Sequence, residues 1–328
     1  MAKIDEIEMD IKISIIIPFY NVEQYVAECL DSVFNQNLSE DEYEVICVND
    51  GSTDGSRKVV EGYLAKHPNM SLVDHPHNIN LGSARNTGVK AAKGKYIWHV
   101  DSDDGIMPNC LKPIVEICEE RQLDVLEFGY IGAHDLPISI GEPARTREVV
   151  TGIEYINRYF MSNFGAICPI WRRVYRRAFL EANAIKSPSI NMGEDEPYAI
   201  HVFVTAERVS FEPEDWYKHR INTSSLVGED KKNWSAKKWY EASILCAKNL
   251  NYVYKKVYNK MPPVISQQVR EMVMYNVHYY IRFEEMMSVE AQKGFWQICK
   301  QEFWSNLYVF RYLGKKNALD YIRKVLVA

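Results

Sequence analysis

Over the first hundred residues, the hydrophobic pattern alternates between strand-like segments and segments with helical spacing. Four short runs rich in apolar residues are typical of buried strands: 11–17, 43–48, 71–74 and 96–100. Between them, apolar or small residues recur every three or four positions and predict amphipathic helices: 22–34, 59–64 and 83–93. Strand and helix that alternate in this way predict right-handed βαβ units. We therefore expect an α/β fold with a Rossmann-like, mainly parallel sheet flanked by helices.

The pattern becomes less regular after residue 104. A further strand is expected near 124–130 and helices near 151–161 and 171–182, whereas the chain beyond residue 226 is mainly helical in pattern. The expected organisation has three parts: an N-terminal tail (1–10), an α/β domain (11–226) and a mainly helical C-terminal domain (227–328).

Polar clusters follow the apolar runs, at the edge of a parallel sheet where ligands bind. The fourth run leads into Asp101-Ser102-Asp103-Asp104. Like charges this close raise one another's pKa or recruit a cation, and an Asp-x-Asp pair offers the hard oxygen ligands that Mg²⁺ or Mn²⁺ accepts. The alternative is a solvated acidic turn.

Two further polar segments point to an anionic, base-bearing ligand. Asp50 ends the second run and precedes small residues, so its carboxylate can accept an N–H of a base. The alternative is a helix-capping turn. Arg85 lies at a helix start, where backbone amides favour anions, although it could equally be a partner of the aspartates. Asn21 is expected to cap the first helix.

Composition and charge narrow the class of protein. The 328 residues are 47% hydrophobic and 25% charged, as in a soluble globular protein. Residues 229–328 carry 17 Lys or Arg against 9 Asp or Glu and are basic, although the whole chain has a net charge of −5. The rest of the chain is therefore acidic. The acidic N-terminal body argues against nucleic-acid binding. Seven scattered cysteines fit a reducing cytoplasm, and we expect neither a secretory signal nor a transmembrane helix.

Four segments in order resemble the family-2 glycosyltransferases, which have the nucleotide-sugar-binding GT-A fold. The matching segments are SIIIPFYN (14–21), EVICVNDGSTDGS (44–56), NLGSARNTG (80–88) and GKYIWHVDSDD (94–104). The resemblance is strong over 12–110 and thinner to about residue 226. Neither a G-x-G-x-x-G fingerprint nor a phosphate-loop motif is present, so nicotinamide-dinucleotide and phosphate-loop folds lack their signatures.

The resemblance implies residue roles. Nucleotide-sugar binding would come from Pro18, Tyr20, Asn21, Asp50, Ser52, Gly82, Arg85, Asp101, Ser102, Asp104 and Arg220. Mn²⁺ or Mg²⁺ would be held by Asp101, Asp103 and His219. Asp104 would bind the donor sugar or orient its loop.

The resemblance also implies a catalytic base. The segment Gly193-Glu194-Asp195-Glu196 matches the family's Glu-Asp pair, with Asp195 as base and Glu194 as a neighbour that contacts the acceptor. The alternative is an acidic first helical turn that complements the helix dipole. The expected reaction is an inverting transfer of a sugar from a nucleoside diphosphate, UDP above all, to an acceptor hydroxyl of a surface polysaccharide or lipid-linked saccharide.

Two other functions stay open at this stage. A sugar-phosphate nucleotidyltransferase shares the fold plan but needs a Gly-rich basic loop after the first strand. A non-catalytic nucleotide-sugar-binding subunit would have a decayed site, whereas the acidic cluster is intact. The segment Lys231–Tyr240 mixes lysines with aromatic residues and suggests peripheral contact with the inner face of the membrane; the alternative is a helix face with buried Trp. The sequence leaves open whether the chain forms a homo-oligomer.

Overall fold

The computed structural model describes residues 11–132, 147–160, 168–220, 245–281 and 296–297. The chain divides into two compact units built from interleaved segments. We call residues 1–151, 170–186 and 206–221 the sheet unit, and residues 152–169, 187–205 and 222–328 the helical unit. The expected tail (1–10), the expected domain boundary at 226/227 and the segment Lys231–Tyr240 lie outside the described residues and stay predictions.

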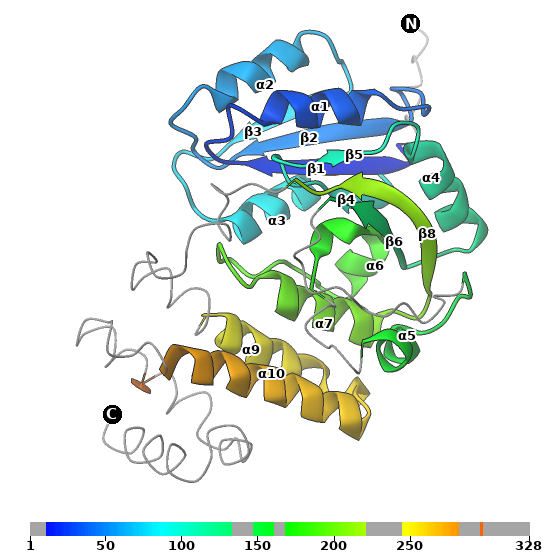
Figure 1. Ribbon diagram of the computed structural model, residues 1–328, viewed down its shortest axis with the longest axis vertical. Helices are drawn as coiled ribbons and strands as arrows, with labels where there is room; N and C mark the ends of the chain where they lie inside the picture. The colour runs from blue at the N-terminus through cyan, green and yellow to red at the C-terminus, as the bar shows by residue number, and fades with distance from the viewer. Residues whose placement is uncertain (1–10, 133–146, 161–167, 221–244, 282–295, 298–328) are drawn as a thin grey trace, which may run out of the picture. The chain divides into compact units, whose positions relative to one another are not determined.

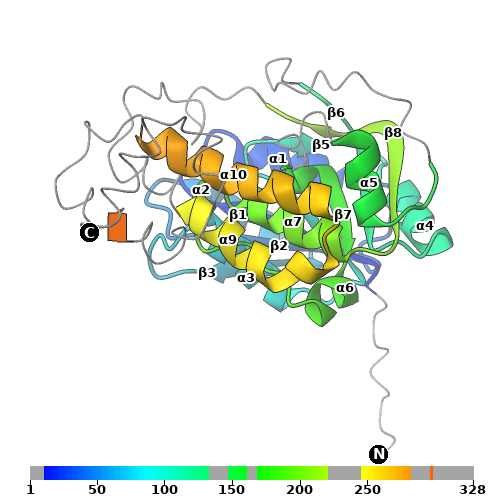
Figure 2. The same ribbon diagram turned by 90° about the horizontal axis from the view of Figure 1, so that it is seen from below.

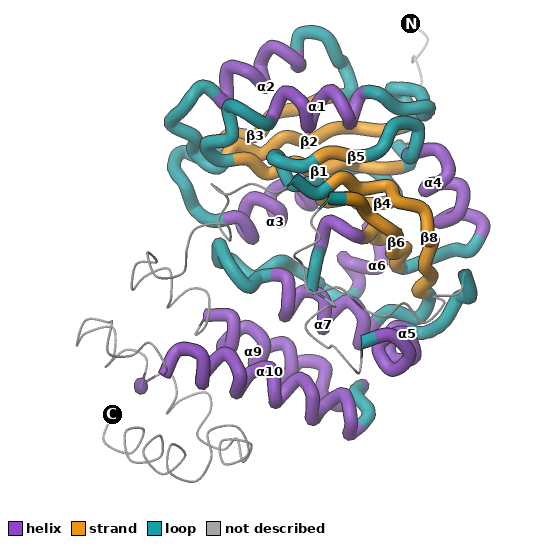
Figure 3. Tube along the Cα trace, in the orientation of Figure 1, coloured by secondary structure: helices purple, strands orange, loops and turns teal. Residues whose placement is uncertain are grey.

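The sheet unit is built on an eight-stranded mixed sheet in the order β3-β2-β1-β4-β7-β6-β8-β5 (Figures 1 and 3). The strands are β1 Ile13–Phe19, β2 Tyr43–Asn49, β3 Met70–Asp74, β4 Tyr96–His99, β5 Gly105–Ile106, β6 Val125–Ile131, β7 Arg173–Arg176 and β8 Val209–Lys218. Neighbours among β1 to β4 are parallel, as the alternating pattern predicted. β7 is antiparallel to both β4 and β6, β5 is antiparallel to β8, and β6 and β8 are parallel.

Helices cover both faces of the parallel half. They are α1 Val26–Phe34, α2 Ser56–Leu64, α3 Leu81–Ala91 and α4 Leu111–Glu120, with the shorter α6 Arg177–Ala182 after β7. Side chains alternate across a strand, so Ile15 and Ile17 join the core that contains Leu30 of α1. Ile16 points to the other face, where a Cβ on Gly88 of α3 would collide with its side chain. The small residue at 88 therefore lets α3 lie close to β1.

The segment expected to be a helix at 171–182 is instead a 3-10 turn, Ile170–Arg172, followed by β7 and α6. The prediction was wrong because the arginines of this stretch look like a solvated helix face but are buried. Arg173 lies 2.8 Å from the Glu127 carboxylate, and Arg172 donates to the Phe128 carbonyl at 2.8 Å. Pairing with β6 therefore turns a charged sequence into an interior strand.

The helical unit contains α5 Gly152–Tyr159, α7 Asp195–Thr205, α9 Cys246–Val257, the 3-10 turn Tyr258–Lys260 and α10 Pro263–Ile281. The Tyr155 ring of α5 stacks on the Phe203 ring of α7 with centroids 5.5 Å apart. α9 and α10 run side by side (Figure 2). Within the described ranges, no helix combines the length and apolarity that a bilayer crossing requires.

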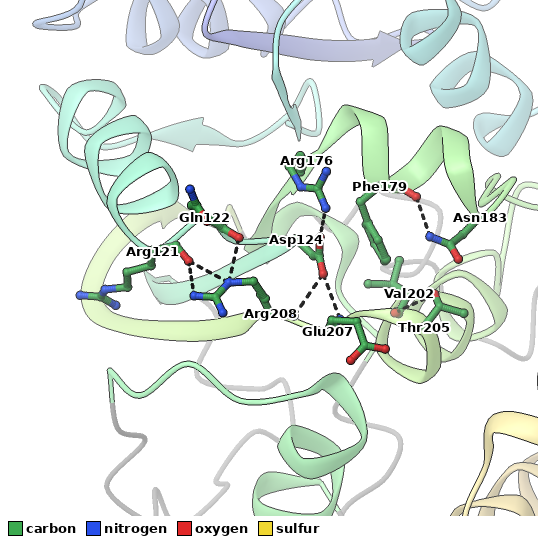
Figure 4. Close-up of polar contacts among 10 residues, drawn as sticks. All are labelled: Arg121, Gln122, Asp124, Arg176, Phe179, Asn183, Val202, Thr205, Glu207 and Arg208. Carbon is green, nitrogen blue, oxygen red and sulfur yellow. Dashed lines mark hydrogen bonds and ion pairs between the residues drawn. The ribbon is translucent and has the colours of Figure 1, made fainter.

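A buried carboxylate ties the far edge of the sheet unit together (Figure 4). Asp124, just before β6, forms an ion pair with Arg176 and accepts hydrogen bonds from the backbone N–H groups of Glu207 at 2.9 Å and Arg208 at 3.1 Å. Arg208 in turn donates to the Arg121 carbonyl at 2.8 Å. Asp124 therefore joins the start of β6, the end of β7 and the segment that enters β8.

Replacement of this carboxylate should destabilise the fold. Asp124→Ala leaves two backbone donors and Arg176 without their shared acceptor, so we expect the free energy of unfolding to fall by about 2–4 kcal/mol. Urea denaturation measures the change. Glu119→Ala removes a surface ion pair with Lys95 and should change it by less than about 0.5 kcal/mol. Equal effects of the two substitutions would contradict this role of Asp124.

Candidate functional site

The carboxyl ends of β2, β1 and β4 lie next to one another in the sheet. β1 stands between the other two, with Phe19 opposite Asn49 and Ile16 opposite His99. The residues that follow these strands therefore meet at one edge of the sheet. The structure brings together there the predicted residues after β1 (Tyr20 and Asn21), after β2 (Asp50 and Ser52) and after β4 (Asp101 to Asp104). Pro18 is a buried member of β1 itself.

The loops after β1 and β2 are interlocked. Asn21 has a positive φ of 52°, and its side-chain oxygen accepts the Thr53 N–H at 2.8 Å. Its own N–H donates to the Ser52 hydroxyl at 3.2 Å. The prediction that Asn21 caps α1 was wrong, because this pairing occupies the side chain and α1 begins after Tyr25 without a side-chain cap. Tyr20 stays 43% exposed beside these loops.

Asp50 is held in a buried pocket rather than exposed in a turn. It is 3% exposed, and its Oδ1 accepts hydrogen bonds from His75 Nδ1 at 2.7 Å and from the Ile79 N–H at 3.0 Å. Gly51 has a φ of 74°, and a Cβ there would lie 2.5 Å from the His77 carbonyl carbon. The loop after β3 thus closes over Asp50, and only glycine fits at 51.

Arg85 pairs with the acidic cluster. Its side chain is 2% exposed, and Nη2 donates to Asp101 Oδ1 at 2.9 Å. The start of α3 presents it: the Asn80 side chain caps the helix by accepting the Ser83 N–H at 2.8 Å, and Gly82 is buried in the first turn. The sequence left two roles for Arg85, an anion-binding residue or a partner of the aspartates, and the contact with an aspartate is present.

Asp104 binds protein groups with both carboxylate oxygens. Oδ2 accepts the Tyr217 hydroxyl at 2.6 Å, and Oδ1 accepts the Arg220 N–H at 2.7 Å. Burial, and next the charge of Asp101, raise the pKa of Asp104 to about 8. These contacts favour the loop-orienting role over direct sugar binding. Ser102, which lies between Asp101 and Asp103 in the sequence, is buried.

Arg220, just after the end of β8, contacts the same loop. Arg220 donates from Nε to the Asp103 carbonyl at 2.9 Å and forms an ion pair with Glu28 of α1. Its guanidinium lies 5.5 Å from the centre of the Tyr25 ring. The hydrogen bond from Arg220 is the main cause that lowers the pKa of Glu28. Arg220 is therefore next to the Asp-x-Asp loop, and its role in nucleotide-sugar binding stays a prediction.

His219 lies close to both predicted metal-binding carboxylates. Burial lowers the pKa of His219, while the charges of Asp101 and Asp103 act in the opposite direction. The ring packs at 5.3 Å from Trp171, and its buried Nδ1 has no hydrogen-bond partner among the described residues. Over those same residues, no three His, Cys, Asp or Glu side chains are arranged to hold a metal ion by themselves.

Glu194 and Asp195 belong to the helical unit. Gly193 has a φ of 74° and turns the chain into α7, which begins at Asp195. Glu194 is buried, and its carbonyl accepts the Tyr198 N–H at 3.4 Å. Glu196 accepts a hydrogen bond from the Cys246 thiol at 3.4 Å. The acidic first turn exists as expected, and the catalytic roles of Glu194 and Asp195 stay a prediction.

Sequence reasoning missed two partners of the predicted residues. His75 was not identified as the partner of Asp50, although it directly follows a strand at the same edge of the sheet as Asp50. Tyr217 was likewise not identified as a partner of the acidic cluster. Its hydroxyl contacts Asp104, and it also lies 3.2 Å from the Asp101 N–H, so it joins both ends of the acidic cluster.

Solved structures resemble this fold. The structure of Staphylococcus aureus TarS (residues 1–349) in complex with UDP-GlcNAc superposes with a TM-score of 0.67 at 22% identity, covering 96% of this chain and 90% of that one. A mannosyltransferase, PcManGT from Pyrobaculum calidifontis, in complex with GDP-Man and Mn²⁺, gives 0.51 at 16% identity, covering 96% of this chain and 86% of that one. The fold is of the GT-A type, which confirms the expected α/β class.

Sequence relatives agree with the fold. An uncharacterized glycosyltransferase of Bacillus subtilis, EpsJ, is 36% identical over 220 residues, which cover 66% of this chain and 62% of EpsJ. The poly(ribitol-phosphate) beta-N-acetylglucosaminyltransferase TarS of Staphylococcus aureus is 31% identical over 201 residues, 61% of this chain and 34% of TarS. The chain thus spans less than two thirds of the length of these relatives. Residues 14–179 match the family described as glycosyl transferase family 2, and this chain therefore belongs to that family.

Proposed function

We propose that this chain is an inverting, metal-dependent glycosyltransferase that moves a sugar from UDP to an acceptor hydroxyl in the synthesis of a surface polysaccharide or lipid-linked glycan. The observation that carries the proposal is the placement of Asp50 after β2 and of Asp101 and Asp103 after β4 at one edge of the sheet, with Arg85 of α3 bound to Asp101. A base-reading carboxylate after one strand and an acidic pair two strands away match the two ends of a nucleoside diphosphate.

The nucleoside end of the donor is assigned to the interlocked loops. Asp50 offers a fixed carboxylate to a base N–H, and the exposed Tyr20 ring stands beside the loop that Asn21 and Ser52 hold together. The names of relatives support a nucleotide-sugar donor, since TarS has been solved with UDP-GlcNAc. UDP is accordingly the donor nucleotide that we propose.

The residues after β4 fit a divalent cation. Asp101 and Asp103 provide hard oxygen ligands, and their charges act on His219, whose buried Nδ1 has no hydrogen-bond partner in the described part of the chain. Mg²⁺ and Mn²⁺ sites of this kind use one or two carboxylates and take their remaining ligands from substrate phosphates and water. Bound there, the cation would act as a Lewis acid for the departing diphosphate. Arg85 holds Asp101 in place, and Arg220 holds the Asp103 backbone.

The acceptor end is assigned to the start of α7. Asp195 would take the proton of the acceptor hydroxyl, and Glu194 would orient the acceptor. The relatives named as poly(ribitol-phosphate) transferases support a glycan or polyol acceptor of the cell surface. We further propose that the enzyme works on the cytoplasmic side, in peripheral contact with the membrane, because of the lysines and aromatic residues of 231–240.

A panel of nucleotides tests the proposed function. The protein is mixed with UDP, GDP, CDP and their sugars in Mn²⁺, and thermal unfolding and slow donor hydrolysis are followed. Binding at about 100 times the dissociation constant stabilises the folded state by about 2.7 kcal/mol, so the correct donor class should raise the unfolding temperature by a few degrees. No shift with any nucleotide would contradict the proposal.

Donor binding should depend on Asp103. Asp103→Ala removes one of two carboxylate ligands, and we expect the cation-dependent UDP affinity to fall by about 100-fold or more because the diphosphate then meets uncompensated charge. Titration calorimetry in Mn²⁺ and in EDTA measures the UDP affinity. Asp41→Ala, at an exposed carboxylate before β2, is the control and should bind UDP like the wild type. Equal wild-type affinity in Mn²⁺ and EDTA would exclude the cation role.

Glycan transfer should depend on Asp195. Asp195→Asn keeps the size of the side chain but removes the base, so we expect transfer to the acceptor to fall by about 10²–10⁴ while the UDP-sugar affinity is kept. Glu196→Gln, in the same helical turn, is the matched control and should retain most activity. Both need assays with the acceptor present, because donor hydrolysis by water does not report on this base. If Asp195→Asn transfers the sugar as fast as the wild type, another residue must be the base.

A further inference from the structure

A continuous chain of hydrogen bonds lies behind the proposed base site. His75 Nδ1 lies 2.7 Å from Asp50 Oδ1, and His75 Nε2 lies 2.9 Å from the Thr87 hydroxyl. The three residues come from the ends of β2 and β3 and from α3. The side chains of His75 and Asp50 are only 9% and 4% exposed. The imidazole therefore links the carboxylate to the body of the fold.

The two oxygens of Asp50 are not equivalent in this arrangement. Oδ1 accepts from both His75 and the Ile79 N–H. Oδ2 accepts no hydrogen bond from any residue that the structure describes. A carboxylate offers acceptors only, so one oxygen is saturated by the protein and the other is left for a ligand that brings a donor.

The same contacts fix the proton of the ring. Because Asp50 accepts, His75 Nδ1 carries the hydrogen of that bond. Nε2 lies 2.9 Å from the Thr87 hydroxyl, which can donate to it, so a ring with its proton on Nδ1 satisfies both partners. Rotation of the imidazole would break both bonds at once. His75 thereby fixes the orientation of the Asp50 carboxylate.

We propose that His75 is a positioning residue that gives the donor site its preference for a base with an N–H at the edge facing Asp50, as uracil has at N3. Cytosine presents an acceptor at the same position, and two acceptors that face each other leave both without a partner. The inference rests on the proposed function, because it specifies how the donor site of that function selects its base.

Two substitutions separate this role from a purely structural one. In His75→Asn the amide nitrogen falls near the position of Nδ1, so the donor to Asp50 is kept and the bond to Thr87 is lost. In His75→Gln the amide reaches toward the position of Nε2, so the bond to Thr87 is kept and the donor to Asp50 is lost. A residue that merely tied β3 to α3 would be replaced better by Gln than by Asn.

The test compares the dissociation constants of UDP and CDP in Mn²⁺ for the wild type and both variants. We expect the wild type to prefer UDP, His75→Asn to keep that ratio, and His75→Gln to reduce it by about tenfold, as for the loss of one hydrogen bond to a charged group. His77→Asn, an exposed histidine of the same loop, is the control and should keep the wild-type ratio.

Other results would contradict either the proposed function as a whole or only the role of His75. If the wild type binds neither nucleotide, the proposed function and this inference both fall. If the wild type prefers UDP and His75→Gln keeps the same ratio, only the role of His75 falls. ¹⁵N NMR of the unsubstituted protein provides a test that needs no variant: a His75 ring protonated on Nε2 alone would exclude the arrangement.

Discussion

Three carboxylates stand within four residues at the end of β4, and their mutual repulsion is the constraint on which the site depends. Two of them bind different segments of the chain through their side chains: Arg85 of α3 binds Asp101, and Tyr217 of β8 binds Asp104. The Arg220 backbone adds a second donor to Asp104. Because Arg85 and Tyr217 are buried, the acidic loop is preorganised by the fold. The diphosphate and the cation that we propose would bind beside this loop, where the cation would offset its negative charge.

The proposed base site also depends on a charge that the fold holds in place, here the single carboxylate of Asp50. Asp50 is removed from solvent and tied to His75 and to the backbone of Ile79, so its orientation is set before any ligand arrives. Gly51 makes this closure feasible, since the loop after β3 passes where a side chain would otherwise stand. Fixed polar groups at both ends favour one length and one polarity of ligand, which is what a nucleotide-sugar site requires.

The parallel half of the fold was predictable because its strands are rich in apolar residues and its helices are amphipathic. Asp50 and Asp101 could be placed at one edge of the sheet for the same reason, since each follows such a strand, whereas their roles and that of Arg85 came from the resemblance to a known family. β7 could not be predicted, because its buried arginines are explained only by Glu127 on a strand nearly fifty residues earlier. The link between His75 and Asp50 likewise depends on the path of a loop, which periodicity does not encode.

The position of β7 has a consequence for how the chain is made. β4 lies between β1 and β7 in the finished sheet, yet β7 begins at Arg173, long after β4 ends at His99. At about 5–20 residues per second, a ribosome would need on the order of 4–15 s to deliver β7 after β4. During that interval the nascent sheet exposes an apolar edge strand with unpaired backbone groups. Slower synthesis of residues 100–172 would lengthen that interval and the exposure of this edge.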